Sequence, residues 1–239
     1  MGKRLKQQRR GKGSNAYTKP PLAGKADVMF PNRVQQGALQ GEVIDFVDSP
    51  MHSSLLMKVR FEDMSEHVLI APEGIQIGGK IHEGNSAPVA IGNILPLSNI
   101  PDGMLIYNVE LNPEDGGKFA RAAGSYATVV SHLDTGVSVL LPSKTTVELS
   151  NDCKAQIGVA AGGGAGVAPI LRAGKSHYMH HAVNALWPRY RGVKGNPVDH
   201  PFGGKQHHKG ASSMTSWNAP PGAKVGHIGA SRVGRKKRG

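Results

Sequence analysis

The sequence holds a single cysteine, few aromatic residues and no long apolar run. Cys153 is the only cysteine among 239 residues, which excludes a disulfide framework within the chain and a cysteine-rich zinc module. Aromatic residues make up 5% and hydrophobic residues 38%, so a hydrophobic core cannot extend over the whole chain. No apolar run approaches the roughly 18 residues of a membrane-spanning helix, and the basic N-terminus lacks the apolar segment of a signal peptide. These absences fit a reducing cytosol, and we expect no membrane partner.

Acidic residues are scarce at both ends of the chain. The net charge is +12, yet residues 31–153 carry −8, while residues 1–30 carry +7 and residues 154–239 carry +13. Most of the 29 Lys and Arg residues therefore lie in the two ends. Lysine and arginine neutralise phosphates and release condensed counterions, so both ends are predicted to bind a polyanion.

The middle of the chain has the pattern of short strands. In 54–61, alternate residues from Leu55 to Phe61 are expected on one buried face. Further short runs rich in β-branched residues or tyrosine are separated by turn signals, and they lie at 104–111, 126–133, 136–141 and 145–150. Because no long amphipathic helix is indicated, we predict an all-β protein that contains two small closed barrels.

Turn-forming residues cluster at 84–90, and we predict the boundary between the barrels there. The expected domains are a basic N-terminal extension at 1–35, a first barrel at 36–86, a second barrel at 87–160 and an extended basic tail at 161–239. Cys153, at the expected end of a strand, is predicted to be small and partly buried.

The tail is rich in glycine, proline and cations and has almost no apolar clusters. It buries too little apolar surface to offset a backbone entropy of about 1–2 kcal/mol per residue, so we expect a partner to order it. Trp187, Tyr190 and Trp217 lie among the cations and can stack on unpaired bases. This favours RNA over DNA, whose readers usually carry a compact helix. A solvated linker or a non-specific basic tail is the alternative.

Two features of the tail invite other interpretations. His177, His180 and His181 have the spacing of ligands on one helical face, but no carboxylate or thiolate lies near them in the sequence. Contacts to phosphates or bases are therefore favoured over a metal site. The glycine run at 158–169 lacks the closing Lys-Ser/Thr of a phosphate-binding loop, and we interpret it as a flexible strap after the last strand.

Asp199 and His200 raise the question of catalysis. A carboxylate beside an imidazole can orient a general base, but sequence neighbours rarely adopt that geometry, and no Ser or Cys nucleophile in a strained turn accompanies them. Consecutive tight turns through 196–201, in which Asn and Asp side chains bond backbone N–H groups, are the simpler interpretation. They would hold His200 outward as a contact residue.

Longer motifs resemble one family. The chain is similar to the universal large-subunit ribosomal protein two family over essentially its full length, most closely to its archaeal and eukaryotic cytosolic branch, and an archaeal source is favoured. The motifs that carry this resemblance are QRRGKG (8–13), LIAPEGIQIG (69–78), GNILPLSNIPDG (92–103), NVELNPEDGGKFARAAG (108–124), IGVAAGGG (157–164), WPRYRGVKGNPVDHPFGG (187–204) and NAPPGAKVG (218–226).

The resemblance implies an OB-fold barrel at 36–86, an SH3-like barrel at 87–160 and a structural role in the cytoplasmic large ribosomal subunit. The implied partners are large-subunit ribosomal RNA, the small subunit across the subunit interface and neighbouring ribosomal proteins. The family supports subunit assembly, subunit association, tRNA binding and the architecture of the peptidyl-transferase region. No enzymatic activity, metal site, cofactor or stand-alone homo-oligomer is expected, while magnesium ions that bridge to RNA remain open. A free-standing nucleic-acid chaperone with cationic tails is the alternative.

The family motif matched by Asp199–Pro201 implies that His200 lies near the peptidyl-transferase region, where RNA performs the chemistry. The bacterial pattern has a second histidine where this chain has Phe202, so a role that needs that imidazole is not expected here. The residues expected to contact RNA are Lys3, Arg4, Arg9, Arg10, Lys12, Lys118, Arg121, Gly162, Gly163, Gly164, Arg172, Lys175, His177, Arg189, Arg191, Lys194, Asn196, Asp199, His200, Gly203, Gly204, Lys205, Trp217 and Arg232.

Overall fold

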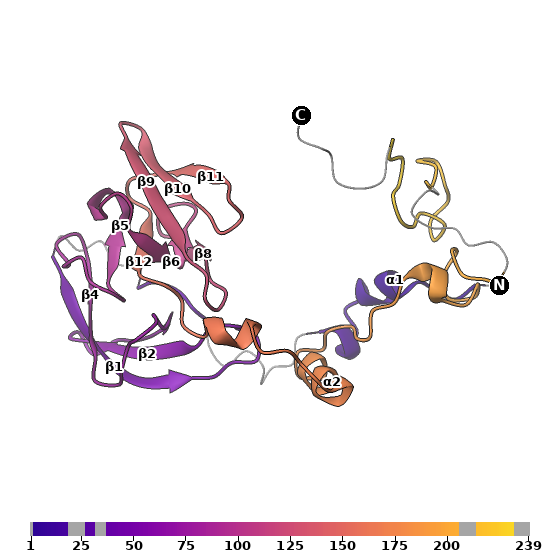
Figure 1. Ribbon diagram of the computed structural model, residues 1–239, viewed down its shortest axis with the longest axis horizontal. Coiled ribbons are helices and arrows are strands. Elements are labelled where there is room, and N and C mark those ends of the chain that lie inside the picture. Colours follow the sequence, from indigo (N-terminus) through magenta and orange to yellow (C-terminus); the bar gives the residue numbers. More distant parts are fainter. Residues whose placement is uncertain (1, 19–26, 32–36, 206–213, 232–239) are drawn as a thin grey trace. The chain divides into compact units, whose positions relative to one another are not determined.

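Figure 1 shows a computed structural model of the chain, which describes residues 2–18, 27–31, 37–205 and 214–231. The chain divides into two compact units. We call residues 20–175 the β unit, and residues 1–19 with 176–239 the terminal unit. Among the described residues, no helix has the length and apolar composition that a bilayer crossing requires.

Strands dominate the β unit, as predicted for an all-β protein. They are β1 (Leu39–Val47), β2 (Leu56–Phe61), β3 (Glu66–Ile70), β4 (Lys80–Glu83), β5 (Ile94–Pro96), β6 (Leu105–Tyr107), β7 (Val109–Glu110), β8 (Gly117–Phe119), β9 (Ala127–Leu133), β10 (Gly136–Leu140), β11 (Thr146–Leu149) and β12 (Lys154–Ile157). The five predicted strand regions are confirmed by β2, by β6 with β7, and by β9, β10 and β11.

Ten of these strands form one sheet in the order β11-β10-β9-β6-β12-β5-β4-β1-β2-β3, and β7 pairs separately with β8. The pairing of β4 with β5 is parallel and the other ladders are antiparallel. Within the described part of the chain, β11 and β3 are not paired with each other, so no closed barrel is found.

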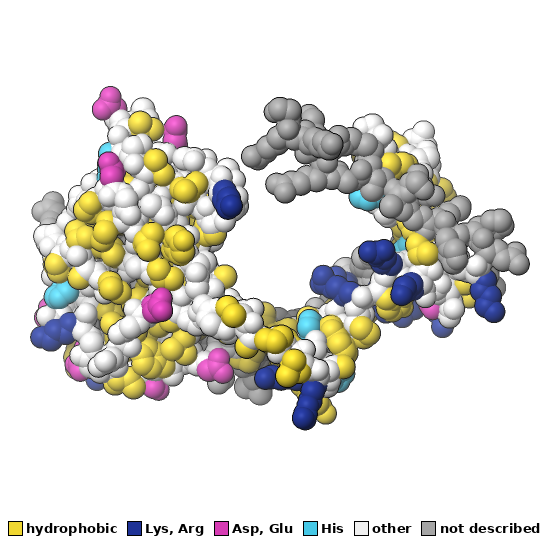
Figure 2. Space-filling view, viewed as in Figure 1, with side chains coloured by type: hydrophobic (Ala, Val, Ile, Leu, Met, Phe, Trp, Pro, Cys, Tyr) yellow, Lys and Arg dark blue, Asp and Glu magenta, His cyan; other side chains and the backbone are white. Residues whose placement is uncertain are grey.

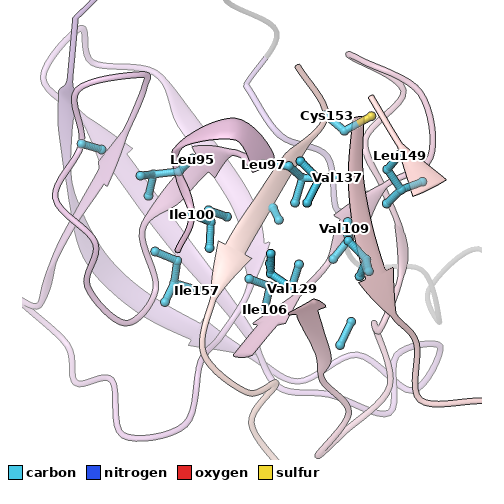
Figure 3. Close-up of a cluster of buried hydrophobic side chains, with 14 residues drawn as sticks. Leu95, Leu97, Ile100, Ile106, Val109, Val129, Val137, Leu149, Cys153 and Ile157 are labelled. Atoms are coloured by element: carbon cyan, nitrogen blue, oxygen red, sulfur yellow. The ribbon is translucent and has the colours of Figure 1, made fainter. Parts of the chain in front are cut away.

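Two hydrophobic cores lie along this sheet. The first includes Met57, Val59 and Phe61 of β2, and the second, drawn in Figure 3, gathers residues from Ala87 to Ile157. Ile94 packs in the first core, and its neighbour Leu95 packs in the second. Because successive side chains of a strand point to opposite faces, β5 can contribute to both.

The expected alternation in 54–61 is wrong at its beginning. Met57, Val59 and Phe61 are buried as predicted, but Leu55 is exposed and Leu56 is fully buried. Leu56 packs in a third cluster with Tyr107, whose hydroxyl donates to the Ile70 carbonyl at 3.1 Å. Since Leu55 precedes β2, it does not follow the two-residue period of the strand.

Cys153 was expected at the end of a strand and only partly buried, and both expectations are wrong. It lies directly before β12 and is fully buried in the second core. Burial, together with the negative charge of Glu110, raises the pKa of the Cys153 thiol to about 11. The side chain is therefore a neutral hydrophobic residue at physiological pH.

The glycine-rich strap follows β12 within the β unit. Its 3-10 helix η4 (Gly163–Gly166) has no buried residue, and Leu171 further along is 88% exposed. Backbone hydrogen bonds fix the beginning of the strap, because the Ala161 amide donates to the Ala71 carbonyl and the Ala160 carbonyl accepts the Gly124 amide, both at 2.9 Å. The chain also passes close to Gly124, where a Cβ would meet the Gly163 Cα at 2.5 Å. Two backbones therefore touch there without side chains between them.

Candidate nucleic-acid interface

The terminal unit joins the two basic ends of the sequence, as the indigo and orange ribbons of Figure 1 illustrate. The Lys3 amide donates to the Val198 carbonyl at 2.8 Å, and the Asn184 side-chain amide donates to the Thr18 carbonyl at 2.6 Å. Leu5, which precedes helix α1 (Lys6–Arg10), is one of the few buried apolar residues of this unit. The N-terminal arm therefore packs on the segment that contains the NPVDHP motif.

A cavity of about 380 Å³ opens where the arm meets this segment. The cations on its wall come from both ends of the sequence, and the wall carries one carboxylate, that of Asp199. Its lining residues are Arg4, Leu5, Lys6, Arg9, Arg10, Leu186, Pro188, Arg189, Tyr190, Gly192, Asp199 and His200.

Helix α1 explains why three of these cations face one space. Lys6, Arg9 and Arg10 are spaced i, i+3 and i+4, which places them on the same side of a helical turn. No acidic residue occurs in the first nineteen positions to compensate them. Such like charges repel each other, so the arrangement favours an anion in the cavity.

The terminal unit as a whole is strongly cationic. Its sequence contains eighteen Lys and Arg residues and one acidic residue, Asp199, whereas the β unit contains eleven cations and sixteen acidic residues. In Figure 2 the described Lys and Arg side chains of the terminal unit stand out in dark blue, and the acidic side chains in magenta lie mainly over the β unit. The cavity is therefore part of a surface that is suited to a polyanion.

His200 lies deeper in this site than the sequence suggested. The side chain is half-buried rather than held outward, because its ring packs on the backbone of Gly192. A Cβ on Gly192 would come within 2.2 Å of the imidazole Cε1, so only glycine leaves room for the ring. Asp199 and His200 also line a second, smaller cavity of about 220 Å³.

The hydrogen bond of the His200 ring defines its protonation state. The Phe202 backbone N–H donates to the imidazole Nδ1 at 3.0 Å, so Nδ1 carries no proton and the neutral ring has its proton on Nε2. Burial lowers the pKa of His200, which also favours the neutral form. His200 thus offers the cavity a neutral N–H donor.

This geometry does not suit general base catalysis. A base would need a free ring nitrogen, whereas Nδ1 accepts the Phe202 amide and Nε2 bears the proton. A carboxylate that orients a catalytic histidine accepts a hydrogen bond from its Nδ1–H. In His200 the Nδ1 atom instead accepts the Phe202 amide, so Asp199 does not take that role.

The predicted tight turns through 196–201 are present in the backbone. The Asn196 carbonyl accepts the amides of Asp199 at 2.9 Å and His200 at 3.0 Å, so a carbonyl takes the role expected for side chains. Gly203 lies against the same turn, where a Cβ would meet the Gly195 carbonyl oxygen at 2.5 Å. A close approach within the chain therefore accounts for glycine at this position.

Six of the expected contact residues line the larger cavity: Arg4, Arg9, Arg10, Arg189, Asp199 and His200. Lys3 lines the smaller cavity. Other expected residues of the terminal unit lie outside both cavities, and they are Lys12, His177, Arg191, Lys194, Asn196, Gly203, Gly204, Lys205 and Trp217. Lys118, Arg121, Gly162, Gly163, Gly164, Arg172 and Lys175 belong to the β unit, and Arg232 lies outside the described residues.

Arg121 differs from the other expected cations. Its guanidinium donates to the Gly117 carbonyl at 2.8 Å, and burial lowers its pKa. Lys118, on β8, is exposed by contrast. Arg121 thus already bonds the backbone of its own unit.

The histidines of helix α2 (Ala173–Ala182) contact aromatic rings. The His180 ring stacks on the Trp187 ring with centroids 5.8 Å apart. The His177 ring makes a T-shaped contact with the same tryptophan, with centroids 5.9 Å apart. Within the described ranges, no group of three or more His, Cys, Asp or Glu side chains is arranged to hold a metal ion.

The sequence prediction missed Lys6 as a contact residue of this site and named Tyr190 only as a ring that can stack on unpaired bases. Both line the cavity, and the Lys6 ammonium lies 4.4 Å from the Tyr190 ring centroid in a cation–π contact. The helical spacing of Lys6, Arg9 and Arg10 was a usable signal that Lys6 faces the same space as the two arginines. Tyr190 lies between two arginines in the sequence, which was a signal that its ring lies beside cations as well.

Comparisons with known proteins agree on one family. Residues 90–222 match the family described as Ribosomal Proteins L2, C-terminal domain. The chain is 43% identical over 240 residues to the large ribosomal subunit protein uL2 of Natronomonas pharaonis, covering 100% of this chain and 99% of that protein. It is 45% identical over 241 residues to the protein of the same name from Methanococcus vannielii, covering 99% and 100%.

Proposed function

The chain belongs to the family of the large ribosomal subunit protein uL2, and we propose on this basis that it is a structural constituent of the large ribosomal subunit in the cytoplasm. Its partners are ribosomal RNA and neighbouring ribosomal proteins. The relatives cover the full length of the chain, so the proposal extends to both units.

One observation supports RNA binding by this chain: five cations from both ends of the sequence surround one cavity that has a single carboxylate. RNA carries a phosphate at every nucleotide, and each phosphate that a cation neutralises releases counterions. The neutral Nε2–H of His200 adds a donor for a phosphate or sugar oxygen. Arg4, Arg9, Arg10 and Arg189 supply the charge.

Family membership also supports the finer roles. We include in the proposal subunit assembly, association with the small subunit, tRNA binding and the architecture of the peptidyl-transferase region, near which His200 would lie. No catalytic role is included, because the His200 ring already accepts a backbone N–H. The first core of the β unit would correspond to an OB-like module and the second to an SH3-like module.

Removal of two cavity cations tests the proposal. In the full-length protein, Arg9→Gln with Arg189→Gln should weaken binding to large-subunit ribosomal RNA. It should also reduce the slope of log K against log salt by about 1.5, because each lost phosphate contact removes about 0.7–0.9. The measurement is a filter-binding titration at several salt concentrations.

The matched control removes the same charge elsewhere. Lys80→Gln with Lys144→Gln changes two exposed lysines of the β unit, and the salt slope should remain close to that of the unchanged protein. Equal effects of the two double variants would contradict binding at the cavity.

A further inference from the structure

Trp187 and four other rings form a cluster in the terminal unit, and the four are His177, Tyr178, His180 and His181. The His177 ring stacks on the His181 ring, with the two centroids 6.0 Å apart. It also makes a T-shaped contact with the Tyr178 ring, with centroids 5.3 Å apart. Trp187 connects these rings to His180. Three of the eleven histidines take part in this one cluster, so the grouping calls for a physical reason.

The rings do not form a hydrophobic core. Helix α2 contains no buried residue, and its apolar and polar side chains are not segregated onto two faces. Tyr178 is 74% exposed, and His177 and His181 are exposed as well. An aromatic residue that stabilised the fold by burial would not remain so accessible.

The inner ring of the cluster, that of His180, is held by contacts, while the outer rings are exposed to solvent. His180 is half-buried, and its Nδ1 lies 2.6 Å from the Ser176 carbonyl oxygen, so Nδ1–H donates to it. Its ring stacks on Trp187 with an interplanar angle of 28°. These contacts present the exposed faces of His177 and Tyr178 in a defined position.

The surrounding sequence indicates the charge of the occupant. Residues 171–191 contain four cations, Arg172, Lys175, Arg189 and Arg191, and no acidic residue. A flat partner that stacks on rings and carries negative charge fits this setting. An unpaired nucleotide combines both properties, because its base has a π-face and its phosphate is anionic.

We propose that the aromatic cluster of His177, Tyr178, His180, His181 and Trp187 is a stacking site for an unpaired base of RNA. The inference rests on the proposed function and adds to it a contact that is independent of phosphate charge. The exposed ring of Tyr178 receives the base, and His177 packs between this ring and Trp187.

The two tryptophans of the chain provide the experiment. In full-length protein carrying Trp217→Phe, Trp187 is the only tryptophan and reports on the cluster by fluorescence. The probes are a short single-stranded oligoadenylate and an abasic oligoribose-phosphate of the same length and charge. Oligoadenylate should change Trp187 emission in a saturable manner, whereas the abasic strand should bind more weakly and leave the emission unchanged.

Substitution of the exposed ring completes the test. Tyr178→Ala should weaken oligoadenylate binding roughly five- to a hundredfold, the range expected for one stacked base, and should leave binding of the abasic strand unchanged. The matched control is Tyr126→Ala, which removes an exposed tyrosine of the β unit.

The outcomes separate this inference from the proposed function. If both strands bind but produce the same emission change, or if Tyr178→Ala and Tyr126→Ala have equal effects, the stacking site is overturned while RNA binding stands. If neither strand binds the full-length protein, RNA binding by the terminal unit fails as well.

Discussion

His200 combines a half-buried ring, a fixed tautomer and a position in the walls of two cavities. Because Nδ1 accepts the Phe202 amide, protonation of the ring would place a proton against an N–H donor. The residue therefore provides a neutral donor to its site over the physiological pH range. Gly192 makes this possible, since any Cβ there would overlap the imidazole.

We predict that His200 titrates below an ordinary histidine. Burial lowers its pKa from the value of about 6.5 expected for the unfolded chain, so the unfolded state takes up the proton first as the pH falls. The stability that the neutral ring contributes is complete above pH of about 6.5 and is lost as the pH falls through the lower folded pKa. NMR of the ring nitrogens in the protein bound to large-subunit ribosomal RNA, where the terminal unit is expected to be ordered, measures this directly. Titration of His200 at or above 6.5 would contradict the assigned environment.

Phe202 is a packing residue beside His200. The centroids of the Phe202 and His200 rings are 5.3 Å apart. A Cβ on Gly226 would meet the Phe202 ring at 3.0 Å. The sequence did not indicate this packing role, because the contact with Gly226 joins residues that are 24 positions apart. A close approach of this kind leaves no periodic signal in the sequence.

At the scale of elements, the glycine-rich strap passes directly over the backbone at Gly124, and we call this contact the backbone crossing. Gly124 donates its amide to the Ala160 carbonyl at 2.9 Å and touches Gly163. The strap therefore begins from a fixed point on the β unit, although its own residues 162–175 are exposed.

Gly124→Ala should lower the free energy of unfolding of the β unit by more than the backbone strain of a positive φ accounts for. Its φ of +68° disfavours any side chain, and the new Cβ would also meet the Gly163 Cα. Gly103→Ala is the matched control, because its φ is +81° but no atom lies within 4 Å of the added Cβ. Urea unfolding should give a free energy of unfolding that is about 1–3 kcal/mol lower for Gly124→Ala than for Gly103→Ala. Equal losses in the two variants would rule out the crossing as the cause.

Strands with a clear period were predicted from the sequence, and strands without one were missed. The run at 126–133 is rich in β-branched residues, and β9 confirms it. β1 escaped prediction because it contains Gly41 and two acidic residues, and Gly41 is required since a Cβ would meet the Val59 side chain at 2.7 Å. β12 is four residues long and two of them are polar, so its burial depends on its central place between β5 and β6.

At the scale of the whole molecule, charge was the most informative property of the sequence. The basic ends and the acidic middle correspond closely to the terminal unit and the β unit. The packing of the N-terminal arm on the segment near Val198 was not predictable, because individual backbone contacts such as Lys3 to Val198 join positions that are 195 residues apart. Such contacts follow from the fold and not from any local pattern.

The terminal unit has little to hold it together by itself. Among its described residues, only Leu5 and Val225 are buried hydrophobic residues, whereas the β unit contains two extended cores. Ordering costs about 1–2 kcal/mol per residue in backbone entropy, and repulsion between its cations adds to that cost. We therefore expect its arrangement to depend on the polyanion that it binds.

Hydrogen exchange of the full-length protein, alone and bound to large-subunit ribosomal RNA, tests this claim most directly. Amides of 2–18 and 176–205 should exchange fast in the free protein and slowly in the complex, while strands such as β2 and β10 should be protected in both states. Protection of the terminal unit without RNA, or fast exchange that persists in the complex, would contradict the account.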